Sequence, residues 1–200
     1  MNMHHILRQF GRFILVGLFI FEFLNLVKIL HFSLDFTWLG LMITSGMALI
    51  IIESISFFLK KHTGKPVLGL VYFMASISVL ADAAGDVFHI YSSYEHTDQI
   101  LHFLGGGCVA ICIFSVVKAY NDAKIIKLSR FSQIFYPICV ASFMGTLYEI
   151  EEYTEDIFFH TNRLGDGYDT ANDLLLNNTG ALFFCLLVYI IITRFKKAAG

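Results

Sequence analysis

The sequence predicts an all-α fold, a polytopic membrane helix bundle in which six transmembrane helices form one integral membrane domain over residues 1–200. Composition is the first reason, because 56% of the residues are hydrophobic, only 15% are charged, and the mean hydropathy is +0.68. Soluble domains are usually about 45–50% apolar and about 25% charged. The second reason is that the apolar residues fall into six runs, each close to the roughly 20 residues that a membrane span needs.

Short polar loops separate the six predicted spans. The spans cover residues 9–31, 36–59, 67–91, 98–118, 131–156 and 172–194. The first has the positive start and apolar run of a signal peptide. It has no small-x-small cleavage site and continues too long, so we expect it to be retained as a span. We find no internal repeat and no low-complexity linker, which is why one domain is predicted.

The basic residues predict the orientation. Of the 14 Lys and Arg, all except Lys28 and Arg163 lie at or near the start of span 1, the loop between spans 2 and 3, the loop between spans 4 and 5, or the end of span 6. Basic loops stay in the cytoplasm, so we expect both termini there, in a multi-pass protein of the inner (plasma) membrane. Of the 16 acids, all except Glu22, Glu53 and Asp122 lie at or near the opposite, extracytoplasmic end.

Four spans bring polar side chains to that end at helical spacing. Residues three, four or seven apart share one helical face. The four stripes are Asp82, Asp86 and His89 in span 3; Asp98 and His102 in span 4; Glu149, Glu152 and Asp156 in span 5; and Asp166, Asp169, Asp173 and Asn177 in span 6. Because the topology brings these stripes to the same depth, we expect them to face one shared site.

Each stripe also has an ordinary explanation. Asp98 and Asp169 could simply cap helices, Glu151 and Glu155 are expected to face the aqueous loop, and a lone His102 would more often be a hydrogen-bonded core residue. So many carboxylates at one depth would nevertheless repel one another. A bound cation would neutralise them, or several would hold protons.

Carboxylates with one or two imidazoles suit Mg²⁺, Mn²⁺, Fe²⁺ or Zn²⁺, and an all-oxygen subset would suit Ca²⁺. We therefore predict a divalent metal ion as cofactor, with proton sharing as the alternative. The predicted ligands are Asp98, His102, Glu149, Glu152 and Asp173. Gly105, Gly106 and Gly107 follow His102, and small residues let helices approach closely in lipid. We expect Gly145 and Gly180 to serve the same purpose.

Three segments carry a resemblance to known proteins. "TDQILHFLGG", "YEIEEY" and "GDGYDTANDLLLNNTGA" resemble, in this order, the YjdF-like bacterial inner-membrane proteins, and the wider VanZ-like group with its D-x3-H-F motif and later D-x3-N-x2-G-A. The resemblance covers roughly residues 82–190. Two departures are Glu149-x2-Glu152, where the VanZ-like motif has Glu-x2-Gln, and a longer stretch from Arg163 to Asp173. The resemblance implies an envelope membrane protein, since the VanZ-like group is associated with resistance to lipoglycopeptide antibiotics, and it names no reaction.

These observations lead to three hypotheses. The first is a metal-dependent enzyme that hydrolyses or transfers a lipid or lipid-linked head group. Asp169 or His89 would be its acid or base, and Arg163, Asp86 and Asn177 would contact the substrate. The second is a cation or proton transporter, because intramembrane acids and histidines are typical of such pathways. The third is a non-catalytic envelope or antibiotic-resistance protein with a proton-sharing scaffold.

Several other function classes find no support in the sequence. It contains no G-x-G-x-x-G, P-loop or G-x-S-x-G motif and no basic stripe for nucleic acid. The four cysteines lie in apolar runs without zinc-finger spacing, and core packing explains them best. We therefore expect membrane lipid as the partner, with a lipid-like substrate. An oligomer is compatible with the sequence.

Overall fold

The computed structural model describes residues 3–94 and 96–198, with only the backbone described for residues 192–198. This part of the chain forms helices and no strands, which confirms the all-α prediction. The helices are α1 (Met3–Leu26), α2 (Trp38–Thr63), α3 (Gly69–Val87), α4 (Ile90–Ser93), α5 (Thr97–Asp122), α6 (Arg130–Phe159) and α7 (Gly167–Ala198).

Five of these helices, α1, α2, α3, α5 and α7, are long and apolar enough to cross a membrane. Large apolar side chains such as Phe13, Phe57 and Phe183 are exposed along their flanks, a surface that suits lipid better than water. The predicted fifth span does form a helix, α6, but it is not among these five, and its last turns are rich in acids. The structure therefore supports a multi-pass membrane protein with five candidate spans.

Most helix ends differ from the predicted spans by one to several residues, and three of the differences affect the acidic end. Helix α1 ends at Leu26 and the backbone turns left-handed at Lys28, whereas the first span was predicted to reach residue 31. Helix α3 ends at Val87, so His89, which is also left-handed, does not continue the helical stripe predicted for it. Helix α7 begins at residue 167, before the predicted 172, because Asp166 accepts hydrogen bonds from the first free N–H groups of the helix.

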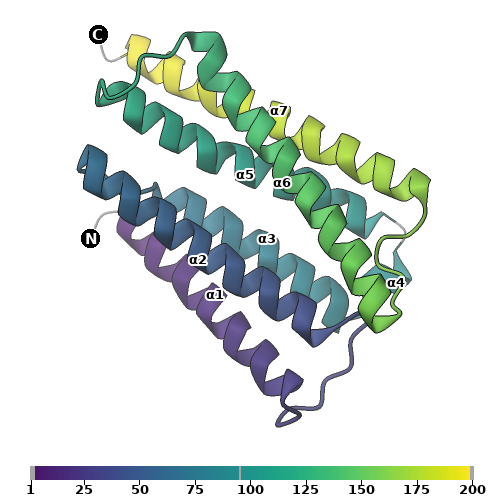
Figure 1. Ribbon diagram of the computed structural model, residues 1–200. Coiled ribbons are helices and arrows are strands. Elements are labelled where there is room, and N and C mark those ends of the chain that lie inside the picture. Colours follow the sequence, from purple (N-terminus) through teal and green to yellow (C-terminus); the bar gives the residue numbers. More distant parts are fainter. Residues whose placement is uncertain (1–2, 95, 199–200) are drawn as a thin grey trace.

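The helices form two groups that lie side by side (Figure 1). Helices α1, α2 and α3 make one group and α5, α6 and α7 the other, and contacts of α3 and α2 with α5 join them. Both termini and loops 64–68 and 123–129 lie at one end, which we call the basic end. Loops 27–37 and 160–166 lie with α4 at the other, which we call the acidic end.

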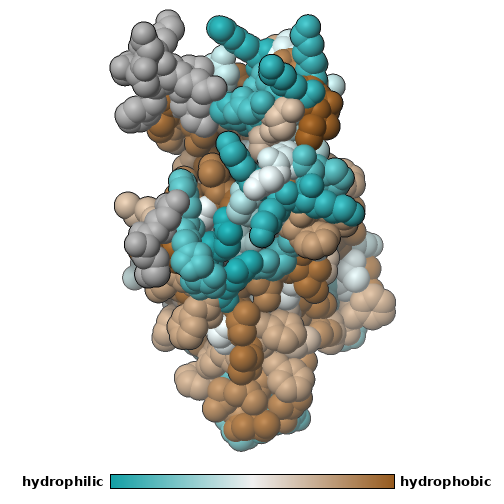
Figure 2. All heavy atoms as spheres, turned by 90° about the vertical axis from the view of Figure 1, so that its left-hand side faces the viewer, coloured by the Kyte–Doolittle hydropathy of each residue, from teal (hydrophilic) through white to brown (hydrophobic). Residues whose placement is uncertain are grey.

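Two apolar clusters lie in the half of the bundle next to the basic end, beside the ion pair of Arg12 with Glu53. One buried cluster joins α2, α3 and α5 and includes Ile52, Val71 and Ile111. A second joins α5, α6 and α7 and includes Phe114 and Cys185. Figure 2 looks onto the basic end and shows hydrophilic side chains gathered on it, with hydrophobic side chains over the flank below them. The buried ionisable side chains of the bundle are therefore concentrated toward the acidic end.

Helices α5 and α7 pack most closely, as the glycines predicted. A methyl group added to Gly106 would collide with the carbonyl oxygen of Asn177, and one added to Gly180 would collide with that of Phe103. Gly145 of α6 likewise leaves room for the Asn177 side chain. Gly105, in contrast, faces open space. The close contact holds the polar face of α5 against that of α7.

Candidate functional site

His102 lies at the centre of the first polar cluster at the acidic end. Its Nε2 is 3.4 Å from an oxygen of Asp98, one turn earlier on α5, and its Nδ1 is 3.6 Å from an oxygen of Glu149 on α6. The side-chain amide of Asn177 on α7 lies 3.0 Å from the same Nδ1. Three helices thus fix the ring from different sides, and the imidazole is almost completely buried.

Two overlapping groups of side chains that could hold a metal ion share His102. They are Asp98, His102 and Asp173, and His102, Glu149 and Glu152. Within each group, one ligand atom per residue lies within 4.8 Å of the others. The structure thus places the five predicted ligands around His102, with Asp98 nearest Nε2 and Glu149 nearest Nδ1. We call these five residues, with Asn177, the His102 cluster. Their role as ligands stays a prediction.

Several atoms of the His102 cluster are buried without a hydrogen bond in the described structure. They are Nε2 of His102, both carboxylate oxygens of Glu149 and Oδ1 of Asp173. A buried polar atom without a partner costs about 1–3 kcal/mol, so a cation among these atoms would remove a real penalty. The donor set of carboxylates and one imidazole fits a divalent first-row metal or Mg²⁺. The Asn177 atom that faces Nδ1 is the amide nitrogen, which donates to this ring nitrogen and leaves the proton on Nε2. A metal on Nε2 would require the Asn177 amide to turn and accept the proton of Nδ1 through its oxygen.

Arg163, in the loop between α6 and α7, is the centre of a second polar cluster. Its Nε donates to Glu152 at 3.1 Å and its Nη2 donates to the hydroxyl of Tyr148 at 2.5 Å. The guanidinium also lies 3.5 Å from Asp82 and 3.7 Å from Glu155. Burial alone would lower the pKa of Arg163, but Tyr148, Asp82 and Glu152 raise it well above its usual range. The guanidinium therefore stays charged. We call these five residues the Arg163 cluster.

Glu152 belongs to both clusters, since it pairs with Arg163 and lies beside His102. Arg163 is predicted to contact a lipid head group, but its guanidinium pairs with carboxylates inside the protein. The expectation that Glu155 faces the aqueous loop is wrong, because Glu155 is only 4% exposed and accepts a hydrogen bond from Thr37, the N-cap of α2. A helical face shared with Glu152, three residues earlier, could have shown this.

Asp86 and His89 lie apart from the His102 cluster. Asp86 accepts hydrogen bonds from the backbone N–H groups of Asp35 and Phe36, at 2.6 and 2.9 Å. The ring of His89 lies 2.5 Å from the Asp35 carboxylate and 3.1 Å from the Ser33 hydroxyl. Both residues fix loop 27–37 over the acidic end. Their predicted substrate and catalytic roles gain no support from this placement.

Asp169 lies in the first turn of α7, four residues before Asp173 and on the same helical face. It is half-buried, whereas Asp173 is almost fully buried. Asp166 accepts hydrogen bonds from the backbone N–H groups of Tyr168 and Asp169, and so caps the helix. Of the two predicted acid or base residues, only Asp169 therefore shares a helical face with the His102 cluster.

A family model described as "Predicted membrane protein (DUF2238)" matches residues 12–194 of the chain. The chain belongs to this family. No curated protein and no solved structure matches it. The family match includes every residue of the His102 and Arg163 clusters, so both belong to the part of this DUF2238 protein that the family shares. Because the family description states a membrane location and no chemistry, function has to be argued from the site.

Proposed function

We propose that this DUF2238 protein is a membrane enzyme that uses a divalent metal ion to hydrolyse or transfer a lipid or lipid-linked head group. One observation carries the proposal. Metal-ligating side chains from α5, α6 and α7 converge on His102 and leave buried nitrogen and oxygen atoms without hydrogen-bond partners in the described structure. The ion pairs of His102 with Asp98 and Glu149 still leave Oε2 of Glu149 and Oδ1 of Asp173 without a partner in the described structure.

The proposed ligands are Asp98, His102, Glu149, Glu152 and Asp173, and the metal would be Zn²⁺, Mn²⁺, Fe²⁺ or Mg²⁺. Such a metal polarises a phosphoryl or carbonyl oxygen and lowers the pKa of a bound water. Asn177 would orient the His102 ring through Nδ1. Asp169, at the more exposed end of the same face as Asp173, is placed to accept or donate the proton.

The transport alternative is disfavoured by the apolar clusters next to the basic end. Ile52, Val71, Ile111 and Phe114 occupy the half of the bundle that a cation path would have to cross. A non-catalytic scaffold with shared protons stays the main competitor, and it predicts that no metal is bound.

We also propose that α6 is a sixth span, that both termini are cytoplasmic in a bacterial inner membrane, and that the YjdF-like and VanZ-like resemblance reflects kinship.

Metal analysis of the protein purified without chelator tests this function. We expect about one divalent ion per chain and its loss in His102→Ala. His96→Ala is the matched control, because His96 is exposed beside the start of α5 and pairs with Gln99. When the variants are reconstituted with lipid extracts in proteoliposomes, the amount of head group that each releases should be proportional to the metal that it retains. A folded wild-type protein without metal, or full activity in metal-free His102→Ala, would overturn the proposal.

A further inference from the structure

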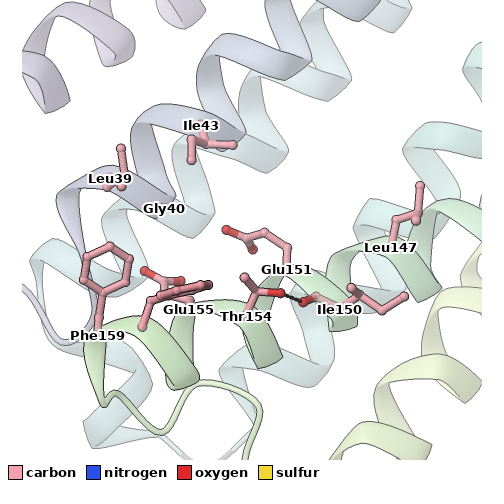
Figure 3. Close-up of a pocket in the computed structure, with 10 residues that line it drawn as sticks. Leu39, Gly40, Ile43, Leu147, Ile150, Glu151, Thr154, Glu155 and Phe159 are labelled. Carbon is pink, nitrogen blue, oxygen red and sulfur yellow. Dashed lines mark hydrogen bonds between the residues drawn. The ribbon is translucent and has the colours of Figure 1, made fainter.

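A groove lies between α2 and α6 at the acidic end and has a volume of about 300 Å³. Figure 3 shows Glu151 and Glu155 of α6 projecting toward Leu39, Gly40 and Ile43 of α2. The remaining lining is mostly apolar and comes from Leu147, Ile150, Phe158 and Phe159 of α6. The groove thus combines apolar walls, on the flank that lipid would cover, with two carboxylates.

Both carboxylates have unused hydrogen-bonding capacity. Oε2 of Glu155 and Oε2 of Glu151 are buried and have no hydrogen-bond partner in the described structure. Glu155 is 4% exposed, and its Oε2 lies 3.7 Å from Arg163 without a hydrogen bond. Gly40 leaves the room for this side chain, because a methyl group there would come within 2.6 Å of the other Glu155 oxygen.

The charge at this place is unbalanced. The single guanidinium of Arg163 faces the carboxylates of Asp82, Glu152 and Glu155, and every ion pair found for these three within the described chain is with Arg163. Glu151, one turn before Glu155 on α6, adds a fourth acid. Arg163 can balance only one of these carboxylates, so the others either hold protons or pair with a cation that enters the groove. In a site of low dielectric constant such an ion pair is strong.

We propose that this groove binds a membrane phospholipid with a primary-amine head group. The ammonium group would donate hydrogen bonds to Glu155 and Glu151, since it has three N–H donors and the free oxygens need donors. An acyl chain would lie along Leu147 and Ile43, toward the middle of the helices. The site is separate from the metal ligands and does not require the metal, although Arg163 and Glu152 connect the two places.

Photolabelling in vesicles tests the proposal. The full-length protein is reconstituted in phosphatidylcholine vesicles with a trace of phosphatidylethanolamine that carries a diazirine in its acyl chain. Phosphatidylcholine and phosphatidylglycerol with the same diazirine are the comparison probes. We expect the ethanolamine probe to label segments 39–43 and 147–159 most strongly. Equal labelling by the choline probe, or preferential labelling by the glycerol probe, would overturn the proposal.

Variants test the two carboxylates. Glu155→Gln and Glu151→Gln should each lower ethanolamine labelling about tenfold, the scale of one charge-assisted hydrogen bond, and Gly40→Ala should do the same by displacing the Glu155 carboxylate. Asp122→Asn, an exposed acid at the basic end, is the control. Undiminished labelling in all three groove variants would contradict the proposal. The metal content of Glu155→Gln is measured in parallel. Lower labelling with unchanged metal content would show that the lipid site was affected and the metal site was not.

Discussion

Arg163 is the only Lys or Arg that forms an ion pair with Asp82, Glu152 or Glu155 within the described chain. Replacing it with Met would remove the ion-pair partner of these buried carboxylates. Breaking a buried ion pair by removing one partner typically costs about 3–5 kcal/mol. We therefore expect Arg163→Met to lower the thermal unfolding temperature in detergent strongly, measured through the fluorescence of the single tryptophan, Trp38.

The loss of stability in Arg163→Met should depend on pH. Acid protonates the carboxylates and removes their uncompensated charge, so the difference in unfolding temperature between Arg163→Met and the wild type should shrink as the pH falls. Lys118→Met is the matched control, because Lys118 pairs with the exposed Asp122 at the loop end of α5, where such pairs contribute about 0–1 kcal/mol. An Arg163→Met protein as stable as Lys118→Met at neutral pH would contradict the buried cluster.

The residues around His102 were predictable, whereas those around Arg163 were not. Residues three or four apart in a helix lie on the same face. Local geometry alone therefore places Asp98 beside His102 and Glu149 beside Glu152, independently of how the rest of the chain folds. Arg163 reaches its partners because loop 160–166 folds back, with Asp156 accepting hydrogen bonds from the backbone N–H groups of Arg163 and Leu164. No periodicity encodes this loop path, so the sequence could not show that Arg163 is buried.

At the scale of elements, the contact between α5 and α7 decides whether the His102 cluster can form. Gly106 packs on the backbone of Asn177, the residue that contacts His102. Gly106→Ala should separate the helices, cost about 1–3 kcal/mol by overpacking, and reduce metal retention. Gly105→Ala is a close control, because its methyl group would enter open space. Unfolding temperature and metal content that are the same in both variants would show that the close packing is unimportant.

Hydropathy located the long helices but not their ends. A run of apolar residues marks the part of a helix that lies in lipid, whereas helix ends depend on local polar contacts. The cap residue Asp166 determines where α7 starts, and the left-handed residue His89 determines where α3 ends. The length of an apolar run contains no information about either feature. The same limit explains why α6, with its acidic last turns, fits the pattern of a span less well.

At the scale of the whole molecule, charge is sorted between the two ends of the bundle. Lys60, Lys61, Lys124 and Lys127 lie near the basic end, while the His102 and Arg163 clusters lie toward the acidic end. This sorting follows from the sequence, because each loop falls at an end fixed by the order of the helices. Because basic loops are retained in the cytoplasm, we expect the acidic end to face away from it.

Cysteine labelling in intact cells would determine the orientation. Tyr168→Cys places an exposed thiol at the acidic end and Ile125→Cys places one in loop 123–129 at the basic end. Because basic loops are retained in the cytoplasm, a membrane-impermeant maleimide should label Tyr168→Cys in intact cells and Ile125→Cys only after the cells are opened. The wild-type protein gives the background, since Cys108, Cys112 and Cys185 are buried and Cys139 lies within α6. The reverse pattern would place the His102 cluster toward the cytoplasm and make an inner-leaflet lipid the substrate to test. Only α6 lies between the two labelled positions. Labelling of both positions in intact cells would therefore mean that α6 does not cross the membrane.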